Sequence, residues 1–133
     1  MARMPVLKTE RLWIRPFMMD DLVDVHRLLD LEMGHADPDD AGGEALAHRA
    51  QWLQWTVLNY EQLADLHQPP YGDRALILVR TGHLIGACGF VPCLGPFEQL
   101  PGFYPGTKGG GPGPWSAEVD LFYAMGWWNR IEK

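Results

Sequence analysis

The stretch that decides the fold is residues 75–91, which read ALILVRTGHLIGACGFV. Its first part, 75–80, is a nearly continuous apolar run of the kind found in a central strand. Thr81 and Gly82 supply a turn and 83–91 returns as a second strand, so the stretch predicts a β-hairpin. Gly86 and Gly89 interrupt the second strand, and glycines there indicate that another group approaches the strand closely.

Upstream of this hairpin the sequence predicts one strand and two helices. Residues 6–16 alternate apolar and charged positions, which is typical of a half-buried strand. Asp20 and Asp21 are placed to cap a helix over 20–32, and a longer helix over 44–67 follows a polar loop. The apolar positions of the longer helix recur at helical spacing and predict a buried stripe of Leu46, Ala50, Leu53, Val57, Tyr60 and Ala64.

Downstream of the hairpin the composition changes sharply. Residues 92–115 are rich in proline and glycine and predict one long loop inserted into the fold. A last strand is expected over 117–125. The order strand, helix, helix, strand, strand, loop, strand predicts an α+β domain over 1–133, with about four mostly antiparallel strands and two helices.

The overall composition excludes some classes of function. Seventeen acidic residues against eleven basic ones give a net charge of -6, which opposes binding to nucleic acid or to an anionic membrane. A membrane-helix segment and a signal-peptide core are absent from the sequence, so a cytoplasmic location is expected. Cys88, Cys93 and the five histidines lack the spacing of metal ligands, and no metal site is predicted.

Three segments carry a resemblance to a known family. They are TERLWIRP at 9–16, GHLIGACGF at 82–90 and EVDLFYA at 118–124. In this order they resemble the first strand, the second hairpin and the fourth strand of the GNAT superfamily of acetyl-coenzyme A-dependent N-acetyltransferases. The closest likeness is to the branch of ribosomal-protein and small-molecule N-acetyltransferases. Asp120 departs from the family pattern, which usually has glycine at that position.

The resemblance implies roles for residues in the C-terminal part of the sequence. Glu118 lies where some members hold a carboxylate that relays a proton from the acceptor amine, although a solvated or arginine-paired carboxylate is the alternative. Phe122, Tyr123 and Ala124 lie on the strand that pairs with the pantetheine arm of acetyl-CoA. Arg130 corresponds to the first position of the loop that holds the cofactor's pyrophosphate.

The rest of that loop is not matched. Lys133 stands where the family pattern requires a glycine, and small residues are needed there because backbone N–H groups must approach the phosphates. We therefore expect the N-terminal half of a GNAT-like fold, incomplete at its C-terminus, that binds acetyl-CoA weakly or not at all and is not catalytic by itself. A complete enzyme would acetylate a small-molecule or peptide amine.

The alternative is a non-catalytic remnant that acts as a small homodimer or interaction module. A strand left at the edge of a sheet exposes unpaired backbone groups and invites pairing with another copy. This alternative predicts self-association through the strand edge at 118–125, with Trp127 and Trp128 between the copies.

Overall fold

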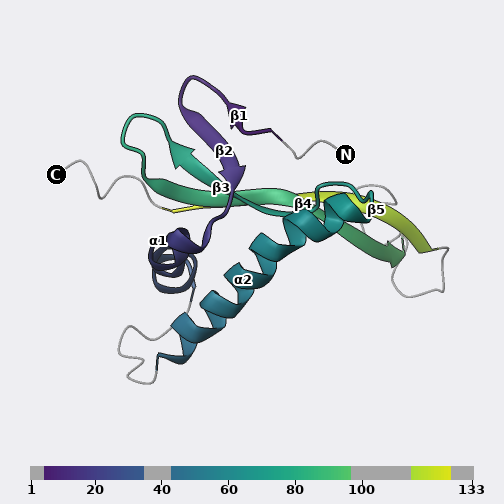
Figure 1. Cartoon of the computed structure of the whole chain (residues 1–133), viewed down its shortest axis with the longest axis horizontal. Coiled ribbons are helices and arrows are strands. Elements are labelled where there is room, and N and C mark those ends of the chain that lie inside the picture. The colour runs from purple at the N-terminus through teal and green to yellow at the C-terminus, as the bar shows by residue number, and fades with distance from the viewer. Residues whose placement is uncertain (1–4, 35–42, 97–114, 127–133) are drawn as a thin grey trace, which may run out of the picture.

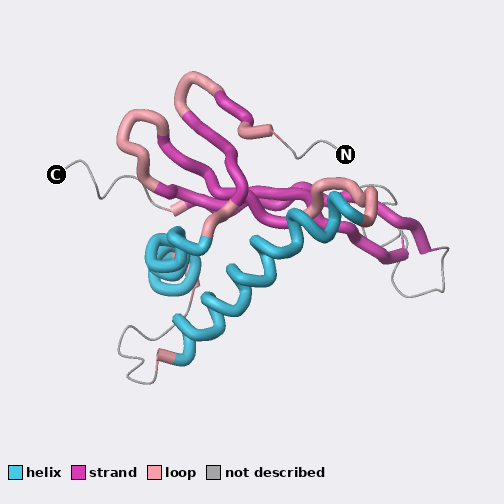
Figure 2. Tube along the Cα trace, viewed as in Figure 1, coloured by secondary structure: helices cyan, strands magenta, loops and turns pink. Residues whose placement is uncertain are grey.

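The computed structural model describes residues 5–34, 43–96 and 115–126, and it confirms the α+β class (Figure 1). One antiparallel sheet carries its strands in chain order, β1-β2-β3-β4-β5. The strands are β1 Leu7–Lys8, β2 Leu12–Pro16, β3 Gly72–Leu78, β4 Leu84–Pro96 and β5 Trp115–Met125. Two helical segments separate β2 from β3, and Figure 2 shows both on the same side of the sheet.

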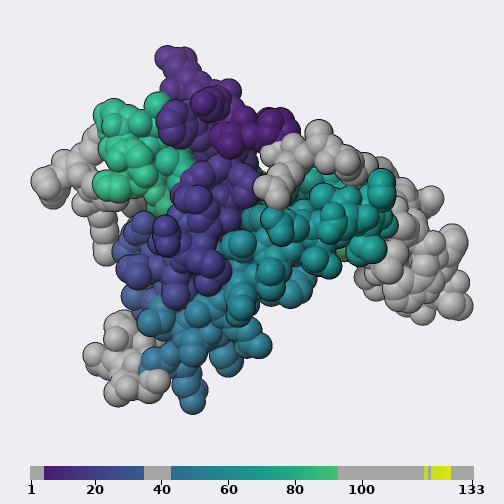
Figure 3. Space-filling model, viewed as in Figure 1, coloured from purple at the N-terminus to yellow at the C-terminus, as the bar shows by residue number. Residues whose placement is uncertain are grey.

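The core lies between these helices and one face of the sheet. The first helical segment is continuous and consists of η1 Met19–Asp21, α1 Leu22–His26 and η2 Arg27–Glu32; the second is α2, Glu44–Asp65. The buried apolar cluster joins both segments to β3 and β4, and it contains Phe17, Val25, Leu28, Leu53, Ala75, Ile77, Leu84 and Ala87. In the space-filling view α2 forms a continuous ridge across the visible face (Figure 3).

The strand predicted over 6–16 is in fact two strands joined by a tight turn. The Thr9 N–H donates to the Leu12 carbonyl at 2.8 Å, and the Leu12 N–H donates to Thr9 Oγ1 at 2.9 Å. Hydroxyl side chains often form such local bonds to the backbone and thereby favour a turn over an extended chain. The sheet therefore has five strands instead of about four.

The helices agree with the prediction except in detail. Met18, and not Asp20, precedes the first helical turn, and Asp21 accepts a hydrogen bond from the Met18 N–H at 2.8 Å. In α2, Leu53 and Thr56 are buried but Leu46 is exposed, because the first turns of α2 extend away from the sheet (Figure 1). Helical periodicity identifies the apolar stripe of α2, but it does not show how much of that stripe the sheet covers.

The loop predicted over 92–115 begins later than expected, since 92–96 belong to β4 and Trp115 begins β5. β3 begins at Gly72, opposite Phe90. From Val91 onward, β5 is therefore the one neighbour of β4 within the described ranges. Pro92 and Pro96 are tolerated there because a proline, which has no N–H, fits a strand position that faces no bonding partner.

Candidate functional site

The last strand, β5, forms one edge of the sheet, and among the described residues it pairs with β4 alone. The Gly126 N–H donates to the Ile85 carbonyl at 2.9 Å, just beyond the register that pairs Met125 with Gly86. Residue pairs of an antiparallel ladder alternate between bonded and non-bonded. The pairs Ala124–Ala87 and Phe122–Gly89 are therefore bonded, and the residues between them direct their N–H and C=O groups away from β4.

These outward-directed residues of β5 also have exposed side chains. We call Val119, Leu121, Tyr123 and Met125 the outer row; their exposed fractions are 56%, 65%, 75% and 50%. Phe90 of β4, opposite Leu121, is 43% exposed. Phe122 and Ala124, which alternate with the outer row, are half-buried. Among the described residues, the edge thus combines backbone groups that have no strand partner with exposed apolar side chains.

This alternation distinguishes among the three residues that were predicted to lie beside pantetheine. Of Phe122, Tyr123 and Ala124, Tyr123 alone directs its backbone groups outward, because those of the other two bond to β4. The side chain of Phe122 lies over the strand instead: a Cβ added to Gly89 would stand 3.1 Å from Phe122 Cε1 and 2.1 Å from the Gly72 carbonyl oxygen. The predicted close approach at Gly89 therefore comes from within the sheet.

One further predicted position, Glu118, is only partly described. The backbone of Glu118 lies in β5 opposite Cys93, but its side chain is outside the described set. Arg130, Trp127 and Trp128 also lie outside the described residues. Their roles stay predictions.

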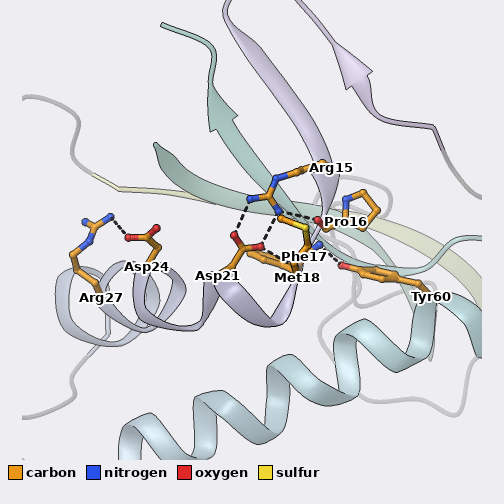
Figure 4. A network of polar contacts seen from close by, with 8 residues as sticks. All are labelled: Arg15, Pro16, Phe17, Met18, Asp21, Asp24, Arg27 and Tyr60. Atoms are coloured by element: carbon orange, nitrogen blue, oxygen red, sulfur yellow. Dashed lines mark hydrogen bonds and ion pairs between the residues drawn. The ribbon is translucent and has the colours of Figure 1, made fainter. Parts of the chain in front are cut away.

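A second group of polar residues lies where the end of α2 meets β2 and β3. The Tyr60 hydroxyl accepts a hydrogen bond from the Phe17 N–H at 3.0 Å (Figure 4) and donates one to the Asp73 carbonyl at 2.5 Å. The Arg74 guanidinium lies 4.2 Å from the centre of the Tyr60 ring, an arrangement that stabilises a buried cation. Arg74 is only 5% exposed, and its Nε has no hydrogen-bond partner in the described part of the chain.

Burial shifts the acidity of three groups in this region. It raises the pKa of the Tyr60 hydroxyl, of the Asp73 carboxyl and of the Cys88 thiol above their ordinary values. Arg74 opposes the shift in each case, and Arg74 and Cys88 face each other across β3 and β4. The sequence analysis did not identify this group. Asp73 and Arg74 stand directly before the apolar run 75–79, and charged residues next to a buried strand indicate that a charge is buried there.

A testable consequence concerns Asp73→Asn. The pKa of the Asp73 carboxyl is higher in the folded protein than its ordinary value of 3.8, so protonation of this carboxyl stabilises the fold. That stabilisation is present below the ordinary value and is lost as the pH rises through the pKa of the folded state. We expect Asp73→Asn to be more stable than the wild type at about pH 7 and no more stable at about pH 3. Urea unfolding at the two pH values measures this, and an equal difference at both would contradict it.

Two further networks fix the helices. Arg15 donates to both carboxylate oxygens of Asp21, at 2.8 and 2.7 Å, and this hydrogen bonding raises the pKa of Arg15 against the opposing effect of burial (Figure 4). Asp30 accepts from Arg49 and pairs with His26 at 2.7 Å. Burial raises the pKa of Asp30, but the bonds from Arg49 and His26 outweigh it and the net shift is downward. These networks join β2 to η1 and η2 to α2.

Comparison with known proteins identifies a structural resemblance but no sequence family. No family model and no curated protein matches the chain. A solved structure from Bordetella pertussis, whose name assigns it provisionally to the GnaT acetyltransferases, aligns with a TM-score of 0.49 and 21% identity. The alignment covers 92% of this chain but only 59% of that one. Within the described residues, no helix is long and apolar enough to cross a membrane, and no three His, Cys, Asp or Glu side chains are grouped to hold a metal ion.

Proposed function

We propose that this chain is the N-terminal part of a GNAT-type N-acetyltransferase fold, and that the β5 edge receives the pantetheine arm of acetyl-CoA. The three motifs support this because each falls on the expected kind of element. TERLWIRP runs from the first turn through β2, GHLIGACGF runs from the β3–β4 turn into β4, and EVDLFYA lies in β5. The observation that carries the proposal is the set of outward-directed backbone groups in the outer row.

The chemistry of the arm fits such an edge. Pantetheine contains two amides, each with one N–H and one C=O, so it can add to a sheet in the way that a peptide strand does. The outward groups of Leu121 and Tyr123 recur every second residue, a spacing of about 6.8 Å along the strand. The exposed side chains of the same residues offer an apolar surface to the methylene and dimethyl groups of the arm.

The acetyl group would then be transferred from the thioester sulfur to an amine: a C–N bond forms, the C–S bond breaks, and coenzyme A leaves as a thiolate that takes up a proton. A protonated amine must lose a proton before it attacks the thioester carbonyl, and a carboxylate near the acyl position can accept that proton directly or through water. We propose Glu118 for this role. The acceptor class that follows is a small-molecule or peptide amine.

The 133-residue sequence does not contain a glycine-spaced loop after β5. Without backbone N–H groups that hold the pyrophosphate, the edge contributes the pantetheine contacts alone. We therefore expect this chain to bind acetyl-CoA weakly, with a dissociation constant near the millimolar range, and to show no acetyltransferase activity by itself.

The proposal is tested by amide chemical shifts during titration with two probes, acetyl-CoA and S-acetylpantetheine, which lacks the pyrophosphate. We expect both to shift the amides of Leu121 and Tyr123 with affinities within about threefold of each other. The amides of β1, at the opposite edge of the sheet, should not respond. Tyr123→Pro, which removes one outward N–H, should weaken binding more than Tyr123→Ala, which keeps it.

Two results would contradict the proposal in different ways. If neither probe shifts β5, the edge does not receive the arm. If acetyl-CoA forms a micromolar complex that S-acetylpantetheine does not, a phosphate site exists within these 133 residues and the expectation of weak binding is wrong.

A further inference from the structure

Within the described residues, segment 119–125 of β5 lacks several of the features that usually prevent strands of different molecules from pairing. Natural sheet edges are protected by short strands, lysines, prolines or bulges. The opposite edge has two of these, since β1 is two residues long and contains Lys8. The segment 119–125 of β5, VDLFYAM, has no lysine or proline, and its register with β4 is continuous.

The edge is also complementary to itself. In a two-fold symmetric pair of antiparallel β5 strands, each outward N–H of one copy must meet an outward C=O of the other. The N–H and C=O groups that point outward belong to the outer row, whose residue numbers are odd. An odd-numbered residue of one copy must therefore lie opposite an odd-numbered residue of the second copy. Every such pairing also brings exposed apolar side chains together on one face of the joined sheet.

Charge then restricts the register. A pairing centred on residue 120 would place the two Asp120 residues directly opposite each other, and like charges in that position are destabilising. A pairing centred on Phe122 separates them by four residues along the strand. It places Leu121 opposite Tyr123 of the second copy and Val119 opposite its Met125, so the whole outer row is paired.

We infer that this chain self-associates through β5, with two copies paired antiparallel about Phe122 to form one continuous sheet. The interface consists mainly of one strand pair and is smaller than the interfaces of stable dimers, so the dimer is weak, with a dissociation constant in the micromolar to millimolar range. The backbone groups that join the copies are those proposed to receive pantetheine. A second copy and the cofactor arm therefore exclude each other, but dimerisation itself requires no cofactor.

The test is sedimentation equilibrium of the 133-residue chain without acetyl-CoA, from about 10 μM to about 1 mM. The wild type is expected to shift from monomer to dimer over this range. Tyr123→Pro removes an outward N–H from each copy and leaves the bonds to β4, and it should weaken the dimer at least about tenfold. Tyr123→Ala, which keeps the N–H, should weaken it less.

A second pair of variants separates the interface from general effects on folding. Leu121→Lys places a charge on the outer row, where 65% of the side chain is exposed, and should abolish the dimer with the circular dichroism spectrum unchanged. Leu58→Lys makes the same change at a site on α2 that is 57% exposed, and it should leave the dimer intact. A wild type that stays monomeric at about 1 mM, or a dimer that Leu121→Lys and Leu58→Lys affect equally, would overturn the inference.

Discussion

Leu53→Ala is expected to destabilise the fold by about 2–5 kcal/mol, because it removes buried methyl groups and leaves a cavity that the surroundings fill only in part. Leu53 has no exposed surface and belongs to the buried cluster that joins α2 to β3 and β4. Urea denaturation followed by tryptophan fluorescence and far-ultraviolet circular dichroism would measure the free energy of unfolding.

Leu58→Ala is the matched control for this prediction. It makes the same chemical change in the same helix, where 57% of the side chain is exposed, and it should cost less than about 1 kcal/mol. Equal losses for the two variants would mean that α2 does not pack on the sheet through Leu53.

Arg15→Met should destabilise the protein by about 2–4 kcal/mol, since it leaves the buried carboxylate of Asp21 without its guanidinium partner. Asp21 is only 7% exposed, and its other bond is the one from the Met18 N–H. In Arg15→Met/Asp21→Asn the charge is removed while an acceptor for that N–H remains. The double variant should therefore regain most of the lost stability.

The control for Arg15 is Arg27→Met. Arg27 pairs with Asp24 and Glu32 on the exposed side of the first helical segment, where 40% of its side chain is accessible, and exposed ion pairs contribute less than about 1 kcal/mol. Chemical unfolding of all three variants at low and high salt would test this. A loss for Arg27→Met as large as that for Arg15→Met would show that burial does not govern the strength of these pairs.

Elements that rest on local patterns could be predicted from the sequence. The hairpin of β3 and β4 follows from the apolar run and the Thr81-Gly82 turn, and α2 follows from its periodicity over about six turns. The strand β1 was missed because it is two residues long and depends on a turn in which the Thr9 hydroxyl accepts a hydrogen bond from the Leu12 N–H, which alternation does not encode. The continuation of β4 through Pro92 and Pro96 was missed because it depends on the neighbours of β4, and beyond Phe90 the described residues pair it with β5 alone.

The same distinction applies to the site. The segment EVDLFYA predicted the strand β5. Which of its residues direct their backbone groups away from β4, Tyr123 as opposed to Phe122 and Ala124, depends on the alternation of bonded pairs, and the hydrogen bond from Gly126 to Ile85 determines that alternation. The group of Tyr60, Asp73 and Arg74 could not be assembled from sequence because its members come from different elements. Tyr60 appeared as one more position in an apolar stripe, whereas its hydroxyl bonds to both β3 and the chain after β2.

The alternation along β5 has a consequence for how selection acts on this strand. The hydrogen bonds to β4 and the packing of the sheet constrain which residues can stand at 122 and 124. The outer row is constrained only by a molecule that binds at the edge. If nothing binds there, codons 119, 121, 123 and 125 should accept polar residues freely in a library selected for folding. If the same codons do not accept polar residues in cells that depend on the protein, the two libraries will differ at every second codon of β5. Such a difference would show that a molecule binds at this edge in the cell, whichever molecule it is.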